Sequence, residues 1–168
     1  SALYKIYSAT PVVTTEPRDC PAGSIFFALR GASFNGNEFA SRALESGCSY
    51  AVVDEPAVAA TDSRMLLVDD CLEALQQLAA YHRKQLATPI VQITGTNGKT
   101  TTKELVAAVL SEKYNVLVTQ GNFNNHIGVP KTLLRLTPEH DIAVVETGAN
   151  HPGEIALLSK ITDADCGL

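Results

Sequence analysis

The 168-residue sequence has few basic residues and no long apolar run, and each shortage argues against a class of protein. Lys and Arg number 13 against 18 Asp and Glu, giving a net charge of −5, which disfavours a basic nucleic-acid-binding surface. No apolar run approaches the roughly 18 residues that a membrane span needs. The first residues also lack the basic start and apolar core of a secretory signal. We therefore expect a cytoplasmic protein that binds neither nucleic acid nor membrane.

The cysteines and the catalytic side chains argue against a cysteine metal or redox site and against covalent catalysis. The four cysteines, at positions 20, 48, 71 and 166, have neither metal-ligand nor redox-motif spacing, so free thiols in a reducing compartment are expected. No Ser-His-Asp or Cys-His arrangement suggests a side-chain nucleophile. With 45% hydrophobic and 18% charged residues, the composition is that of a globular protein.

The first half of the chain reads as a small α/β domain. Short apolar runs at residues 25–29, 50–53 and 65–68 predict strands. Helices are expected from Phe39 to the glycine at 47 and from Asp70 to about residue 86. Residues 30–37, RGASFNGN, are rich in turn formers and predict a loop. We place this domain at residues 1–88, with a junction at Thr88-Pro89.

The second half alternates strands and helices more regularly. Strands are predicted at residues 90–94, 116–119 and 142–146, and helices at 100–112, 130–136 and 154–160. This order is typical of a parallel α/β sheet. Three strands are few for such a sheet. We therefore expect residues 89–168 to be the first half of a larger α/β domain that is cut short.

A glycine loop between the first strand and helix of this second domain is the strongest functional signal. Residues 94–101, TGTNGKTT, follow a strand and open a helix, which is the context of a phosphate-binding loop. Ile93 stands where the longer consensus has glycine, so the match is to a shorter form. An ordinary turn with a solvated lysine is the alternative. The residues expected to bind the phosphates of a nucleotide, which the family resemblance given below implies is ATP, are Gly95, Thr96, Asn97, Gly98, Lys99, Thr100 and Thr101.

Four residues are candidates for charge and metal chemistry. Lys99 is expected to reach the β- and γ-phosphates, and the Thr100 hydroxyl is expected to bind Mg²⁺. Glu146 lies at the carboxyl end of a predicted strand, where it could hold the metal or serve as a cap or surface charge. His151 could contact phosphate or metal, or cap the next helix. Lys99 and Glu146 are the predicted catalytic residues.

An asparagine-rich loop follows the strand at residues 116–119. Residues 121–126, GNFNNH, offer amide donors and acceptors without charge, which suits recognition of a sugar, a peptide or a carboxylate near phosphate. The alternative is a loop that uses asparagine for left-handed turns. The residue types alone favour neither of these two interpretations over the other.

Together these motifs resemble the Mur ligase family. The similarity rests on the glycine loop, on the runs GNFNNHIGVPKTLLRL and ETGANHPGEI, and on GSIFFALRG near the N-terminus. The resemblance implies an ATP- and Mg²⁺-dependent cytoplasmic ligase, expected to be a monomer, that builds peptidoglycan precursors. The two runs are most similar to members that add D-alanyl-D-alanine to UDP-N-acetylmuramoyl-tripeptide through an acyl phosphate.

The resemblance also assigns residues by position. Thr100 and Glu146 are implied as Mg²⁺ ligands, beside which His151 stays a metal candidate from its position alone. Asn124 and Asn125 are implied as contacts of the muramoyl peptide. The implied contacts of the uridine end are Ser24, Arg30, Asn35 and Gly36. Relatives often have Asp-Gly-His where this chain has Asn35-Gly36-Asn37, which puts the individual uridine contacts in question.

Three other functions are kept as alternatives. A sister ligase that adds a single amino acid shares the glycine loop, and a binding module would hold a UDP-sugar or nucleotide without chemistry. A generic P-loop kinase shares only the loop. In the family, a modified lysine, a further histidine ligand and a third domain lie downstream of the region matched here. We therefore expect the 168 residues alone to be inactive.

Overall fold

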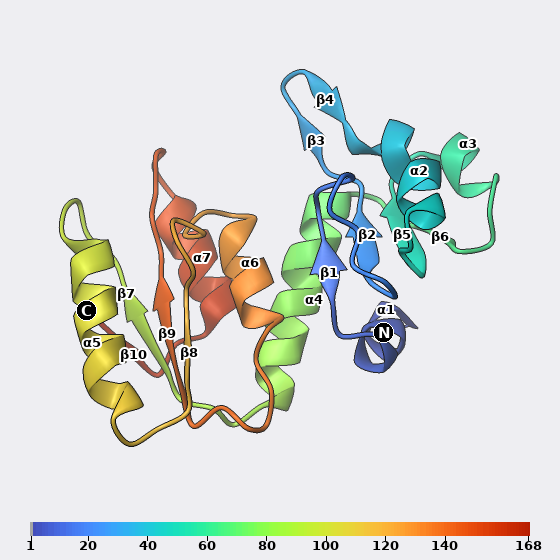
Figure 1. The fold of residues 1–168 in the computed structure, drawn as a ribbon. Helices are drawn as coiled ribbons and strands as arrows, with labels where there is room; N and C mark the ends of the chain where they lie inside the picture. The colour runs from blue at the N-terminus through green and yellow to red at the C-terminus, as the bar shows by residue number, and fades with distance from the viewer. Residues whose placement is uncertain (1) are drawn as a thin grey trace. The chain divides into compact units, whose positions relative to one another are not determined.

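The computed structural model describes residues 2–168, which form two compact units (Figure 1). One unit ends at Leu75 and the other begins at Gln76, so the division falls within helix α4 (Cys71–Gln85). The predicted domain boundary between residues 88 and 89 stays a prediction. No helix among the described residues is long and apolar enough to cross a membrane.

The first unit is built on a parallel four-stranded sheet in the order β1-β2-β5-β6. The central strands β2 and β5 are made of apolar residues and are buried, as expected for strands covered on both faces. Ile25, Phe26 and Phe27 have no exposed surface. The strands are β1 (Val13–Thr14), β2 (Ile25–Phe27), β5 (Tyr50–Val53) and β6 (Met65–Leu67), and the helices are α1 (Ala2–Ala9), α2 (Ala40–Glu45) and α3 (Pro56–Ala59).

The predicted loop at residues 30–37 is wrong, because these residues form a hairpin and the start of a helix. Strands β3 (Arg30–Gly31) and β4 (Phe34–Asn35) pair antiparallel, with Arg30 opposite Asn35. A 3₁₀ helix, η1 (Gly36–Phe39), follows directly. Strands of two residues are too short to show an alternating pattern, so the turn formers dominated the prediction. For the same reason the two-residue strand β1 was not predicted, and the helices α1 and α3 were not predicted either.

The second unit confirms the expected parallel α/β architecture. Its sheet has the order β10-β7-β9-β8, all parallel, with α5 on one side and α6 and α7 on the other in Figure 1. The short edge strand β10 was not predicted. The elements are β7 (Ile90–Ile93), α5 (Lys99–Ser111), β8 (Val116–Val118), α6 (Gly128–Leu133), β9 (Ile142–Glu146), α7 (Glu154–Thr162) and β10 (Cys166–Gly167).

The strand register of this sheet brings distant motifs together. Ile93, the last residue of β7, pairs with Glu146, the last residue of β9. Because parallel strands end at the same sheet edge, the glycine loop after β7 and the carboxylate at the end of β9 are neighbours. The fold therefore places Glu146 beside the loop from which it is separated by about fifty residues in the sequence.

Candidate nucleotide and substrate sites

The glycine loop joins β7 to α5 in a conformation that suits anion binding. Gly98 precedes α5 with φ 77° and ψ 0°, and Gly95 has φ 140°, both in the region that favours glycine. The N-cap residue of α5 is Gly98, so no cap side chain occupies the first N–H groups of the helix. The Lys99 ammonium donates a 2.7 Å hydrogen bond to the Gly95 carbonyl. The loop thus closes on itself through the lysine expected to meet phosphate.

One hollow of about 290 Å³ gathers most of the predicted nucleotide residues. It is lined by six consecutive loop and helix residues, with Asn124 and Glu146 opposite them. Gly95 is the one predicted ATP-binding residue outside this lining. The six are Thr96, Asn97, Gly98, Lys99, Thr100 and Thr101. The fold therefore assembles from three segments a site that the sequence offered only as separate motifs.

Glu146 lies at the centre of this arrangement and is only 1% exposed. Its carboxylate accepts hydrogen bonds from the Thr100 hydroxyl at 3.2 and 3.3 Å and from the Asn124 amide at 2.8 Å. Its backbone N–H donates to the Thr119 hydroxyl at 3.0 Å. The carboxylate is thus held in one orientation, facing Thr100.

The donor set at this place fits Mg²⁺. A hydroxyl and a carboxylate within hydrogen-bond distance are hard oxygen ligands, and Mg²⁺ is commonly held by one or two such groups with phosphate and water completing the shell. The space beside Gly98 is open, since a Cβ built there meets nothing within 4 Å. Among residues 2–168 no group of three or more His, Cys, Asp or Glu is arranged to hold a metal. Thr100 and Glu146 would therefore need nucleotide oxygens to complete the site.

Lys103 is a charged residue of this site that sequence reasoning missed. It lies in α5, has no exposed surface, and its ammonium is 3.5 Å from a Glu146 oxygen. The signal available was helical spacing, because Lys103 and Ala107 are one turn apart and are the buried residues of α5.

The two asparagines predicted to contact substrate have different surroundings. The Asn124 side chain bonds Glu146 and lines the hollow. The Asn125 side-chain oxygen instead accepts from the backbone N–H groups of Ile127 and Gly128, at 3.1 and 2.8 Å, at the start of α6. The alternative that asparagines make left-handed turns is wrong, since Asp163 is the one non-glycine residue with positive φ within residues 2–168.

His151 lies at the start of α7 and is largely exposed. Its backbone N–H donates to Glu154 at 3.0 Å and its ring nitrogen Nδ1 lies 3.3 Å from the same carboxylate. The backbone N–H groups of Asn150 and His151 hold the pKa of Glu154 below its ordinary value. These contacts are those of a helix start, and a metal-binding role for His151 stays a prediction.

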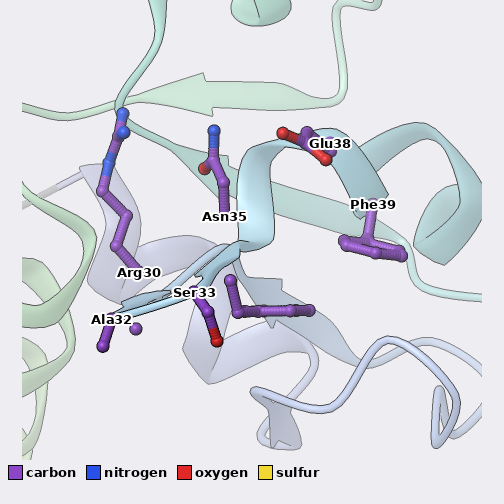
Figure 2. Close-up of a pocket in the computed structure, with 8 residues that line it drawn as sticks. Arg30, Ala32, Ser33, Asn35, Glu38 and Phe39 are labelled. Carbon is purple, nitrogen blue, oxygen red and sulfur yellow. The ribbon is translucent and has the colours of Figure 1, made fainter.

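In the first unit, the β3–β4 hairpin and η1 form a second hollow of about 370 Å³ (Figure 2). Phe34 and Phe39 stack with ring centroids 5.0 Å apart and planes 14° apart. The Arg30 guanidinium pairs with Asp54 at 2.8 Å and Glu55 at 2.9 Å. Of the residues predicted to contact the uridine end, Arg30 and Asn35 line this hollow.

An amide network supports the hairpin from behind. The Asn35 oxygen accepts from the backbone and side chain of Asn37, at 3.2 and 2.9 Å. The Asn37 amide in turn donates to Asp54 at 2.8 Å, and its oxygen accepts from the Asp54 backbone at 3.0 Å. Burial raises the pKa of Asp54, but hydrogen bonds from Arg30 and Asn37 outweigh it and lower that pKa overall. Asn37 is thus a buried structural residue in this chain.

Ser24 and Gly36, also predicted to contact the uridine end, are buried. The Ser24 hydroxyl is 3.2 Å from the Cys48 sulfur and has no exposed surface. Gly36 packs against backbone, because a Cβ built there would lie 2.5 Å from the Ala28 carbonyl carbon and 2.6 Å from the Leu29 oxygen. Gly36 thus supports the start of η1, whereas Ser24 lies directly before β2 and contacts Cys48. Direct substrate contact by either residue stays a prediction.

Known protein families match the sequences of both units. A family model described as Mur ligase family, catalytic domain, matches residues 12–83, and one described as Mur ligase middle domain matches residues 93–168. The UDP-N-acetylmuramoyl-tripeptide–D-alanyl-D-alanine ligase of Synechocystis sp. is 46% identical over 157 residues, which is 93% of this chain and 35% of that protein. The Escherichia coli K12 ligase of the same name is 46% identical over 156 residues, with 93% and 34% covered.

Solved structures give the same result. A crystal structure of MurF from Acinetobacter baumannii superposes with a TM-score of 0.86 at 37% identity, over 97% of this chain and 38% of that one. MurF ligase from Thermotoga maritima, solved in complex with ADP, gives 0.81 at 32%, over 90% and 35%. The chain spans about a third of the length of the curated relatives it matches. Because the two matched models together cover nearly the whole sequence, the chain belongs to the Mur ligase family.

Proposed function

We propose that the protein containing this chain is an ATP-dependent ligase that joins D-alanyl-D-alanine to UDP-N-acetylmuramoyl-tripeptide. The observation that carries the proposal is the hollow in which the glycine loop meets Glu146 and Asn124. Curated relatives named for this activity match the chain through both units. As in the sequence-based expectation, the 168 residues alone are not proposed to complete the reaction.

The glycine loop would bind the phosphates of ATP. Backbone N–H groups at the start of α5 and the Lys99 ammonium would face the negative charge that develops on the transferred phosphoryl group. For this the Lys99 ammonium would leave the Gly95 carbonyl, to which it now donates. Thr100 and Glu146 would hold Mg²⁺, which when bound would neutralise charge on the nucleotide phosphates.

The proposed reaction has two steps, and neither needs a protein nucleophile. An oxygen of the tripeptide's terminal carboxylate attacks the γ-phosphorus, the bond to the bridging oxygen breaks, and ADP leaves. The amine of D-alanyl-D-alanine then attacks the acyl carbon of the resulting acyl phosphate. Phosphate leaves, the amine loses a proton, and an amide remains. In both steps the protein's part is positioning and electrostatic stabilisation.

The hairpin hollow would bind the uridine end of the substrate. Its stacked phenylalanines offer an apolar wall, and Arg30 and Asn35 offer polar groups at its rim. Arg30 is half exposed and already fixed by Asp54 and Glu55, so it would meet a ligand without losing much freedom. Two of the three proposed substrates, ATP and UDP-N-acetylmuramoyl-tripeptide, are nucleotides, which supports a cytoplasmic location. We propose a monomeric protein.

Calorimetric titration of this chain tests the two binding functions separately. UDP-N-acetylmuramoyl-tripeptide and Mg-ATP would be titrated in separate runs, with Lys99→Ala as the variant for the second. Binding of the UDP-peptide, and ATP binding that Lys99→Ala loses, are the expected results. Absence of both would contradict the site assignments for this chain.

Activity would be measured on the product of the complete open reading frame that contains these residues. Phosphate release that depends on D-alanyl-D-alanine is expected. Release with a single amino acid and none with the dipeptide would instead identify a sister ligase. Binding of both nucleotides with no phosphate release would identify a binding module.

A further inference from the structure

Lys103 is a buried charge that the proposed reaction leaves unexplained. It lies in the second turn of α5 and has no exposed surface. Its ammonium lies 3.5 Å from a Glu146 oxygen and 3.2 Å from the exposed Glu104 carboxylate, and it donates to the Gly121 carbonyl at 3.2 Å. The contacts with Glu146 and Gly121 come from two other segments of the chain, whereas Glu104 is its neighbour in α5.

The position could have been filled more simply by an apolar side chain. Burying an ammonium is unfavourable unless it is paired and hydrogen-bonded, and replacing a buried ion pair by apolar residues of similar volume is often neutral or stabilising. A lysine here is therefore not explained by stability alone. What it does is join three segments: the helix of the glycine loop, the carbonyl at the start of the asparagine loop, and the carboxylate at the end of β9.

We propose that Lys103 is a positioning residue that holds Glu146 and the asparagine loop in register with the glycine loop. Thr100 and Asn124 bind the same carboxylate from two other directions, so Lys103 completes its fixation. Through Glu146 it would set the geometry at which Mg²⁺ meets the nucleotide. This inference rests on the proposed function only for that last step.

The pairing itself is tested by thermal unfolding of the 168-residue chain without ligand. Lys103→Met leaves the Glu146 carboxylate buried beside an apolar side chain, and the melting temperature should fall by roughly 5–15 °C. The double variant Lys103→Met/Glu146→Gln should melt above Lys103→Met, because the unpaired charge is gone. The control Glu104→Gln, which alters only the exposed partner, should change little. A Lys103→Met variant that fails to fold supports the pairing if Glu146→Gln restores folding.

Three results would overturn the pairing. The first is a Lys103→Met variant that melts within about 2 °C of the parent chain. The second is a double variant whose melting temperature falls by the sum of the falls in the two single variants. The third is a Lys103→Met variant that fails to fold and that Glu146→Gln does not restore.

The positioning role is tested by ADP binding with and without Mg²⁺. The ratio of the ADP dissociation constant in EDTA to that in MgCl₂ measures how much the metal contributes. Lys103→Met should lower this ratio at least fivefold and leave metal-free ADP binding within about twofold, since the loop N–H groups and Lys99 are untouched. An unchanged ratio would mean a purely structural lysine, and a higher ratio would mean that Lys103 only repels the metal. Both results overturn the proposal.

The two readouts separate this inference from the proposed function. If the unaltered chain binds no ADP, the nucleotide site as proposed fails, and the unfolding experiment still decides whether Lys103 and Glu146 are coupled. If ADP binds and Lys103→Met leaves the ratio of the ADP dissociation constants in EDTA and in MgCl₂ unchanged, the positioning role fails and the proposed function stands.

Discussion

Gly36→Ala should destabilise the first unit strongly, although alanine adds only one carbon atom. The new Cβ would lie 2.5 Å from the Ala28 carbonyl carbon and 2.6 and 2.7 Å from the Leu29 oxygen and nitrogen. All three are backbone atoms, so no side chain can rotate away, and the strand end or the 3₁₀ helix must shift. Gly36 also donates a 2.9 Å hydrogen bond to the Leu29 carbonyl, which such a shift would lengthen. Overpacking of this kind typically costs 1–3 kcal/mol, and we expect about 3 kcal/mol here.

Differential scanning calorimetry of the 168-residue chain measures this effect. A loss of about 3 kcal/mol should lower the melting temperature of the first unit by about 10 °C or more. Gly31→Ala is the matched control on the same hairpin, because its Cβ would meet only the Phe34 Cβ, at an ordinary 3.8 Å. A Gly36→Ala variant with an unchanged melting temperature and lost UDP-peptide binding would refute the packing argument and support direct substrate contact.

Three further changes test the second unit. Gly98→Ala should cost about 1–2 kcal/mol and weaken ADP binding, because φ of 77° is strained for alanine even in open space; equal affinity by calorimetry would contradict this. Asn125→Ala should cost about 1 kcal/mol in urea unfolding by removing the acceptor for two N–H groups at the start of α6. Burial lowers the pKa of His82 below 6.5, so the unfolded chain binds its proton first as pH falls. The stability it contributes is complete above pH 6.5 and declines below it. His82→Asn should therefore flatten the fall in melting temperature between pH 7 and 5.

The order of elements in the second unit was predictable from the sequence because its signals are local. β7 is apolar except for Gln92 and β9 except for its last residue, Glu146. Helix α5 follows a glycine and opens with a lysine and a threonine. Their alternation determined the parallel sheet, and the glycine loop indicated phosphate binding. In the first unit the two-residue strands of the hairpin had no periodicity to detect, so residues 30–37 were wrongly expected to be a loop.

The sequence by itself determined which chemical groups are present, and the tertiary structure decided which of them meet. Glu146 was identifiable as a strand-end acid, but only the pairing of β9 with β7 places it beside the glycine loop. Asn124 and Asn125 are adjacent and alike in the sequence, yet one bonds Glu146 and the other caps α6. Lys103 gave no distinct signal, because burial of a charge depends on a partner some forty residues away along the chain. Contacts across such separations depend on strand register and packing, which no local pattern encodes.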